Sequence, residues 1–194
     1  MAYRYYAVKK GKNPGVYRTW KECMEQIEEY EKPSFRGFND EDEALRFAGI
    51  YESPIDESLP YIYIDGSYNP ATKVYGYGGF LFYNDNKYII QGSDNDLEMA
   101  KMRNVAGEIV GATCAIKKAI ELDIKEINLY YDYLGIEYWA TLEWHAKKDG
   151  TKEYQKFCQS IKNDIKINFI KVKSHSKIEG NEEADKLAKQ SVGI

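Results

Sequence analysis

In the first fifty residues, the pattern of apolar and polar positions changes from strand-like to helix-like and back over short stretches. Cys23, Ile27 and Tyr30 recur at the spacing that places side chains on one face of a helix. Asn39 stands where a polar side chain would cap a second helix. The pattern predicts a small ββαβα domain over residues 1–49. Its expected elements are strands at 3–8, 16–19 and 35–38 and helices at 20–30 and 40–48.

A different pattern covers the rest of the chain. Residues 50–60 contain prolines, serines and acids without periodicity, which predicts a linker. Beyond it, three strand-like runs precede alternating helices and strands, an order typical of a mixed sheet with helices packed on it. We therefore expect an α/β domain over residues 61–194, with a mixed five-stranded sheet and flanking helices. The expected elements are strands at 61–65, 76–83, 87–91, 127–132 and 165–173 and helices at 104–121, 134–144, 153–162 and 182–190.

Composition excludes several classes of protein. The chain has 194 residues, of which 43% are hydrophobic and 30% charged, a balance that excludes wholesale disorder. No apolar run reaches the ~18 residues that span a bilayer, and the start does not resemble a signal peptide. The three cysteines are far apart and form no C-x-x-C pair, so a zinc site is not expected. We expect a monomeric, cytoplasmic protein with no membrane partner.

Charge is distributed unevenly, although the formal net charge is only −4. Residues 1–21 contain six basic residues and no acid, whereas residues 22–57 contain twelve acids and three basic residues. One face of an otherwise acidic protein can therefore attract a polyanion such as nucleic acid. A solvated basic strand and turn would give the same count, so charge alone does not decide between the two.

Four acids occupy positions where a core-facing element would favour another residue. Asp65 and Asp132 end apolar strand-like runs, Glu108 borders the apolar stripe of a predicted helix, and Asp185 is expected in the first turn of the last helix. Each has an ordinary explanation as a turn residue, a cap, a solvated helix position or a helix start. If all four converge, however, their like charges require divalent cations. Oxygen ligands of this kind suit Mg²⁺ or Mn²⁺, and a pair of such ions supports phosphoryl transfer.

The order of these residues resembles the type 1 ribonuclease H family. The resemblance rests on Asp65-Gly66-Ser67, Gly107-Glu108-Ile109, Tyr131-Asp132, Ser174-His175-Ser176 and Asn181-Glu182-Glu183-Ala184-Asp185. Separately, the N-terminal residues resemble the hybrid-binding domain that many members of the family carry. That second resemblance rests on Tyr5-Tyr6-Ala7-Val8-Lys9-Lys10-Gly11, Pro14-Gly15-Val16-Tyr17, Thr19-Trp20 and Phe35-Arg36-Gly37-Phe38.

The resemblance implies an endoribonuclease that hydrolyses the RNA strand of RNA/DNA hybrids with two Mg²⁺ ions, Mn²⁺ being a possible substitute, and leaves 3′-hydroxyl and 5′-phosphate ends. It implies metal ligation by Asp65, Glu108, Asp132 and Asp185, and help from His175 in proton transfer or product release. The implied substrate contacts are Gly66, Ser67, Arg103 and Asn104. In the small domain, the implied hybrid contacts are the aromatics Tyr6, Trp20 and Phe35 and the phosphate-binding residues Lys9, Lys10 and Arg36.

Some positions depart from the family pattern. Val105 and Tyr133 stand where polar residues are usual, and Gly37 stands where the family often has Lys. Trp139 and Trp144 follow the third acid in a short stretch that also contains acids, so we expect them to pack in the core. Trp20 alone would also be read as a core residue. Two other classes are compatible with the fold: a hybrid-binding protein without catalysis, and a junction resolvase or transposase-like nuclease.

Overall fold

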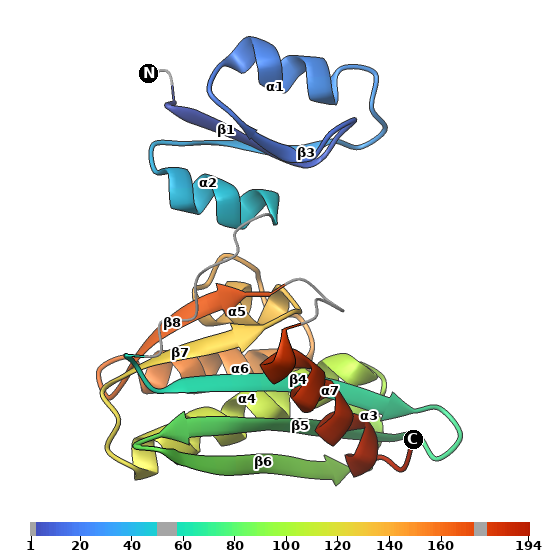
Figure 1. Cartoon of the computed structure of the whole chain (residues 1–194). Coiled ribbons are helices and arrows are strands. Elements are labelled where there is room, and N and C mark those ends of the chain that lie inside the picture. Colours follow the sequence, from blue (N-terminus) through green and yellow to red (C-terminus); the bar gives the residue numbers. More distant parts are fainter. Residues whose placement is uncertain (1–2, 50–57, 173–177) are drawn as a thin grey trace. The chain divides into compact units, whose positions relative to one another are not determined.

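The computed structural model describes residues 3–49, 58–172 and 178–194. The chain divides into two compact units, Met1–Pro54 and Ile55–Ile194, which are treated separately below (Figure 1). Residues 50–57 of the predicted linker lie outside the described part. None of the helices in the described ranges is both long and apolar enough to cross a membrane.

The N-terminal unit has the ββαβα order that the sequence predicts. Its three strands form an antiparallel sheet in the order β2-β1-β3. Because the central strand β1 alternates its side chains, each face of the sheet meets one helix. The elements are β1 (Tyr5–Lys10), β2 (Gly15–Tyr17), α1 (Trp20–Ile27), β3 (Ser34–Phe38) and α2 (Glu41–Ala48).

Each face of this small sheet has its own apolar cluster. Val8 packs with Cys23 and Ile27 of α1 on one face. On the other face, Ala7 packs with Ala44 and Ala48 of α2. The unit therefore has two small cores in place of one large one, and its stability rests on few buried side chains.

The ends of both helices differ from the prediction or refine it. Thr19 and Glu22 form a capping box at the start of α1, which satisfies backbone donors at that end. The helix ends at Ile27, so the prediction that Tyr30 shares its buried face is wrong; Tyr30 is 40% exposed. The cap of α2 is Asp40, not Asn39, because the Asp40 carboxylate accepts the backbone N–H of Glu43 at 2.9 Å.

The C-terminal unit has the mixed five-stranded sheet that was predicted. Strand order is β6-β5-β4-β7-β8. The pairs β6–β5 and β5–β4 are antiparallel, whereas the pairs β4–β7 and β7–β8 are parallel. The strands are β4 (Tyr61–Asn69), β5 (Val74–Tyr83), β6 (Asn86–Asp94), β7 (Glu126–Tyr131) and β8 (Lys166–Lys171). The helices are α3 (Leu97–Ala100), α4 (Asn104–Glu121), α5 (Gly135–Ala140), α6 (Asp149–Ser160) and α7 (Glu179–Ser191).

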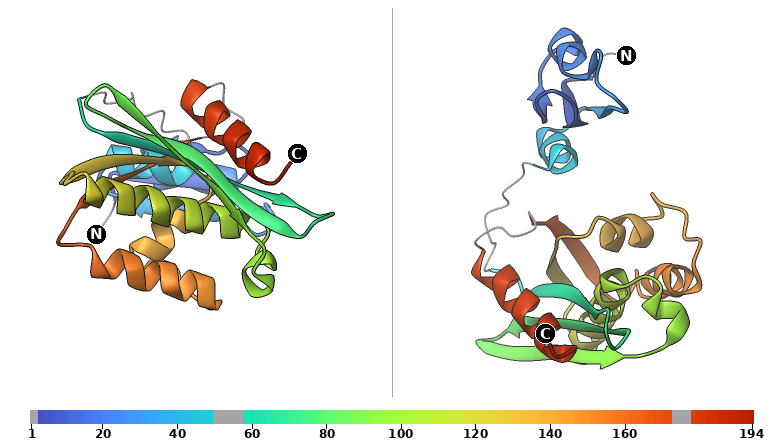
Figure 2. Two further views of the ribbon diagram at one scale, coloured as in Figure 1. Left: turned by 90° about the horizontal axis from the view of Figure 1, so that it is seen from below. Right: turned by 90° about the vertical axis from the view of Figure 1, so that its right-hand side faces the viewer.

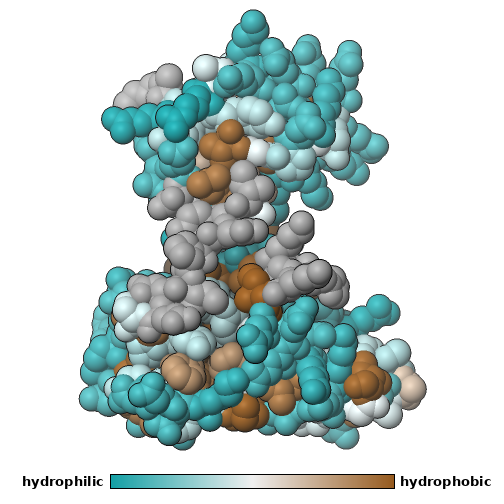
Figure 3. Space-filling view, viewed as in Figure 1, coloured by the Kyte–Doolittle hydropathy of each residue, from teal (hydrophilic) through white to brown (hydrophobic). Residues whose placement is uncertain are grey.

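Helices cover the two faces of this sheet unequally. The helices α4, α5 and α6 lie on one side and contribute most of the main core, whereas α7 crosses the other side over β4 and β5 (Figures 1 and 2). Hydrophilic residues dominate the surface in the view of Figure 3. The site described below lies where α4, α7 and the end of β7 approach the middle of β4.

Two element boundaries and one short helix in this unit differ from the prediction. Strand β4 continues four residues past Asp65, because β5 pairs with it as far as Asn69. Helix α7 begins at Glu179, so Asp185 lies in its second turn, not its first. The four-residue helix α3 was not predicted, since it is too short to show a period.

Candidate active site

Glycine lets helix α4 approach β4 closely enough to bring two acids together. A Cβ built on Gly66 would lie 2.9 Å from Cγ of Glu108 and closer still to the α4 backbone. By strand alternation, Asp65 lies on the α7 side of β4 and Gly66 on the α4 side. Glu108 therefore reaches past Gly66 toward Asp65, although it comes from the opposite face of the sheet.

Three carboxylates meet at this point. Asp65, Glu108 and Asp132 each offer an oxygen, and these oxygens lie within 4.8 Å of one another. Glu108 is only 1% exposed, and Asp132 directly follows the last residue of β7. Because β7 runs parallel to β4 in the sheet, its carboxyl end delivers Asp132 beside Asp65.

Burial and the neighbouring acids raise the pKa values of Asp65 and Glu108. Burial and then the charge of Asp132 raise the pKa of Asp65 to about 6. Burial, followed by Asp65 and Asp132, raises the pKa of Glu108 well above its usual range. Like charges held this close disfavour ionisation unless a cation joins them.

The donor set fits a divalent metal ion. Carboxylate oxygens are the ligands that Mg²⁺ and Mn²⁺ prefer. Glu108 also leaves its buried Oε2 without a hydrogen-bond partner, a costly arrangement that a metal ion would relieve. Asp65, Glu108 and Asp132 are therefore the residues that would hold such an ion.

Asp185 borders the same site but is held by another partner. It lines a cavity of about 270 Å³ together with Asp65, Asp132, Asn181 and Glu182. Its Oδ2 accepts a hydrogen bond of 2.7 Å from Nζ of Lys189, one turn further along α7. This hydrogen bond raises the pKa of Lys189. The structure thus places the fourth predicted acid beside the other three, in an ion pair that the sequence analysis did not foresee although the i,i+4 spacing signals it.

The predicted substrate contacts occupy different settings. Ser67 is 8% exposed, so its side chain lies inside, and Gly66 donates its N–H to Oδ1 of Asp65 at 2.7 Å. In contrast, Arg103 and Asn104 are exposed at the start of α4. Arg103 has φ of 56° and provides no side-chain cap to this 18-residue helix. The N–H groups of Val105 and Ala106 instead donate to the carbonyls of Met102 and Arg103, at 3.2 and 3.0 Å.

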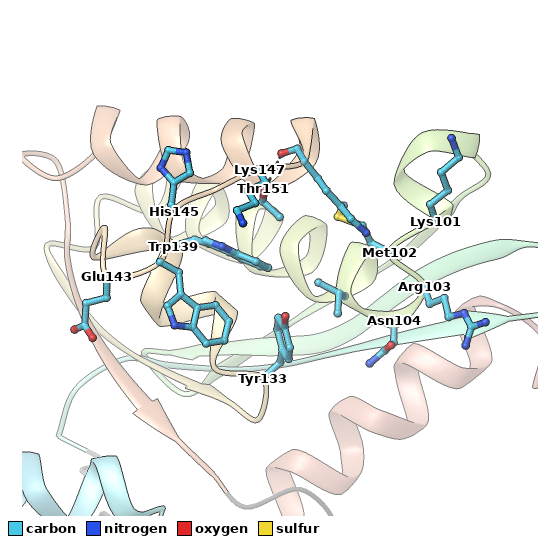
Figure 4. A pocket seen from close by; sticks show the side chains of 13 residues that line it. Lys101, Met102, Arg103, Asn104, Tyr133, Trp139, Glu143, His145, Lys147 and Thr151 are labelled. Atoms are coloured by element: carbon cyan, nitrogen blue, oxygen red, sulfur yellow. Dashed lines mark hydrogen bonds between the residues drawn. The ribbon is translucent and has the colours of Figure 1, made fainter. Parts of the chain in front are cut away.

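A groove of about 620 Å³ adjoins this helix start. In Figure 4, Tyr133 lies between Arg103 and Asn104 on one side and His145 on the other. The expectation of core packing holds for Trp139, which is 9% exposed, but is wrong for Trp144, which is 38% exposed and lines the groove. The groove is basic overall: besides these residues its lining includes Lys101, Lys147, Lys148 and Glu143.

In the N-terminal unit, the three predicted aromatics come together on the face that carries α1. The ring centroids of Tyr6 and Trp20 are 5.5 Å apart, and those of Trp20 and Phe35 are 5.7 Å apart. Trp20 is 46% exposed and Phe35 is 40% exposed, which contradicts a core role for Trp20.

The predicted basic contacts are less uniform. Lys10 is exposed at the end of β1, and Lys9 beside it is half-buried. Arg36 pairs with Ala7 across the sheet, so it projects from the α2 face, where its guanidinium lies 5.4 Å from the ring of Phe38. Arg36 is thus on the opposite face of the sheet from Trp20. His175 lies outside the described residues.

The comparisons with known proteins agree with both units. A family model described as the ribonuclease H1 N-terminal domain matches residues 4–48, and one described as RNase H matches residues 58–193. The chain is 26% identical over 255 residues to Ribonuclease H1 of Homo sapiens, covering 96% of this chain and 88% of that protein. It is 28% identical over 138 residues to Ribonuclease H of Acetivibrio thermocellus, covering 68% of this chain and 92% of that protein.

Solved structures support the fold of the C-terminal unit. RNase H1 from the halophilic archaeon Halobacterium salinarum NRC-1 matches with a TM-score of 0.53 at 18% identity, covering 68% of this chain and 96% of that one. An N-terminal RNase H domain from Mycobacterium tuberculosis, solved as a fusion with maltose-binding protein, matches with a TM-score of 0.54 at 15% identity, covering 68% of this chain and 94% of that one. Together with the carboxylate site, these matches confirm the predicted membership: the chain belongs to the ribonuclease H family and carries the N-terminal domain of ribonuclease H1 ahead of its RNase H domain.

Proposed function

We propose that this ribonuclease H cuts the RNA strand of RNA/DNA hybrids with two divalent ions, Mg²⁺ with Mn²⁺ as a substitute, and leaves 3′-hydroxyl and 5′-phosphate ends. The observation that carries the proposal is the group of three carboxylates whose oxygens lie within 4.8 Å of one another. Bound there, two ions would activate the attacking water and stabilise the leaving oxygen.

The protein's own residues prepare that site. Asp65, Glu108 and Asp132 bring three carboxyl groups to one point, and Asp185 adds a fourth once Lys189 releases it. Near pH 7 a carboxylate with a pKa of about 6 is mostly ionised, so Asp65 is available as a ligand. The cavity beside these acids is open enough for a phosphodiester, since it measures about 270 Å³. From the family resemblance, we assign proton transfer or product release to His175.

Substrate binding involves both units. In the C-terminal unit, the exposed Arg103 supplies donors for a phosphate of the DNA strand, and Asn104 supplies an amide for a ribose hydroxyl. The adjoining groove, with its lysines and exposed Trp144, continues the path of that strand. In the N-terminal unit, the aromatics Tyr6, Trp20 and Phe35 and the cations Lys9 and Lys10 form a second surface for the hybrid. Arg36, on the other face, would reach the duplex only from the sheet edge.

The experiment that tests this function compares three duplexes of one sequence. RNA/DNA hybrid, duplex RNA and duplex DNA, each end-labelled, are incubated with the protein and Mg²⁺ and analysed on a gel. We expect cleavage of the RNA in the hybrid alone, and no cleavage in EDTA. Treatment of the fragments with a 5′-phosphate-dependent exonuclease identifies the ends. Equal cleavage of duplex RNA, or of DNA, would exclude the proposed specificity and favour another nuclease of the same fold.

A further inference from the structure

A tyrosine at the start of the N-terminal unit covers a glycine in its sheet. A Cβ built on Gly37 would lie within 2.7 Å of three ring atoms of Tyr3, so the ring occupies the space that any other residue at position 37 would need. Gly37 pairs with Tyr6 across β1 and β3. The backbone N–H of Arg4, at a bend before β1, donates to the carbonyl of Phe38 at 3.0 Å and fixes the chain beside this position.

Tyr3 thereby extends the aromatic cluster of this unit. Its ring meets the ring of Tyr6 edge-on, with centroids 6.3 Å apart and an interplanar angle of 89°. The contacts continue from Tyr6 to Trp20 and from Trp20 to Phe35. Tyr3 is 51% exposed, more than Trp20 or Phe35. Four rings therefore form a continuous row, which we call the aromatic row, across the α1 face of the sheet.

We infer that Tyr3 is a fourth aromatic contact to nucleic acid, whose ring packs against a sugar of the RNA/DNA hybrid at the end of the aromatic row. The inference rests on the proposed hybrid binding by this unit. An exposed ring held by its neighbours loses little conformational freedom on binding, because its position is already fixed. The excess of basic residues over acids in the first 21 positions attracts a polyanion to this part of the chain.

A contact made by a tyrosine ring depends on salt differently from a contact made by a cationic side chain. A tyrosine ring offers apolar area, whereas a Lys or Arg binds phosphate and releases counterions. Tyr3 should therefore add affinity without adding salt dependence. Because Gly37 has no side chain, the protein exchanges a possible charged contact at position 37 for a ring supplied from position 3.

The experiment measures hybrid affinity of the full chain in EDTA, which prevents cleavage, by fluorescence anisotropy across a range of salt concentrations. We expect Tyr3→Ala to weaken binding about fivefold to tenfold, at the lower end of the range for aromatic platforms, with an unchanged slope of log affinity against log salt. Tyr3→Phe should bind within twofold of the parent, because it retains the ring.

A second pair of variants tests the contact between Tyr3 and Gly37. Gly37→Ala places a Cβ where the ring lies, so we expect it to displace the ring and weaken binding as much as Tyr3→Ala does. The double variant should be no weaker than either single one, since both remove the same contact. Losses that add in full would overturn the proposed geometry.

Two further variants separate the possible failures. Tyr30→Ala removes another exposed tyrosine of the same unit, 40% exposed, that lies outside the aromatic row, and it should bind like the parent. Trp20→Ala reports on the surface as a whole. If Trp20→Ala weakens binding and Tyr3→Ala does not, the inference about Tyr3 is wrong. If neither variant weakens binding, hybrid binding by this unit is itself wrong. Thermal unfolding checks that Tyr3→Ala remains folded. If that variant unfolds, Tyr3→Phe decides: a loss of hybrid affinity as large as that of Tyr3→Ala would overturn the inference.

Discussion

The two units of this ribonuclease H place their functional groups in opposite environments. The N-terminal unit has two small apolar clusters and leaves its candidate binding residues on the surface, where Trp20 and Phe35 are 46% and 40% exposed. The C-terminal unit has a large core and buries a candidate metal ligand, Glu108, to 1% exposure. In the proposed function, recognition uses side chains that cost the fold little, whereas catalysis uses acids that the fold must hold against their repulsion.

The largest expected effect comes from a change in the C-terminal unit. Asp132→Asn should abolish cleavage of the hybrid, because a neutral amide cannot supply the charge that holds the cations, while hybrid affinity stays near that of the parent. Gel analysis at saturating Mg²⁺ and substrate measures the first quantity, and anisotropy in EDTA measures the second. Cleavage within tenfold of the parent would show that the carboxylate group is not the metal site.

Removal of the N-terminal unit should have the opposite signature. Deletion of residues 1–50 should weaken hybrid binding strongly while cleavage at saturating substrate persists. Each lost phosphate contact flattens the slope of log affinity against log salt by about 0.9, so loss of Lys9, Lys10 and Arg36 should flatten it by about two to three. The C-terminal unit can be prepared alone for this test, since it is a compact unit with its own hydrophobic core. Unchanged affinity at physiological salt would contradict the comparison.

A smaller change distinguishes an exposed platform from a core residue. Trp20→Ala should weaken hybrid binding by about 1–3 kcal/mol without changing the salt slope, because a ring contact is lost and no charge is lost. Circular dichroism of the variant should match that of the parent, since Trp20 is nearly half exposed. Unfolding of the N-terminal unit by this substitution would mean that the aromatic row is structural.

The smallest expected effect concerns stability and pH. The pKa of Asp65 is raised to about 6 from its usual 3.8, so the protonated acid favours the folded state. Its stabilising contribution is full below pH 3.8 and is lost as pH rises through 6. Between pH 5 and pH 7.5, metal-free protein should therefore lose a few degrees of its melting temperature, and Mg²⁺ should restore them at the higher pH.

Differential scanning fluorimetry measures this shift, and Asp132→Asn is its matched control. That variant removes the charge that raises the pKa of Asp65 after burial, so its melting temperature should depend less on pH. A parent protein whose metal-free stability rises between pH 5 and pH 7.5 would contradict the assigned repulsion.

The sequence predicted the two domains and the family because both depend on patterns that are local. The helix over 104–121 was predicted with its observed bounds, since its apolar stripe repeats over several turns. The prediction ends the first strand of this domain at Asp65, where the apolar run stops and Gly66 follows. The strand in fact runs to Asn69, because its pairing with β5 continues to that residue although the apolar run has ended.

Contacts between distant residues could not be predicted in the same way. Nothing in the local pattern shows that Tyr3 covers Gly37, because the contact depends on the register of β1 and β3. The face on which Arg36 projects is set by the same register. Trp144 was expected in the core on composition, but the short helix before it ends at Ala140 and leaves the indole at the groove.

Two glycines at the contact between α4 and the sheet give this enzyme a second way to lose activity. A Cβ on Gly66 or Gly107 would collide with the facing backbone, so either substitution must lift the helix that carries Glu108. The proposed two-metal chemistry needs ions roughly 3.5–4 Å apart, a spacing that a displaced ligand would not maintain. A relative could therefore retain every acid and still be inactive. When inactive members are sought among similar sequences, the residues that merely make room deserve the same scrutiny as the residues that bind.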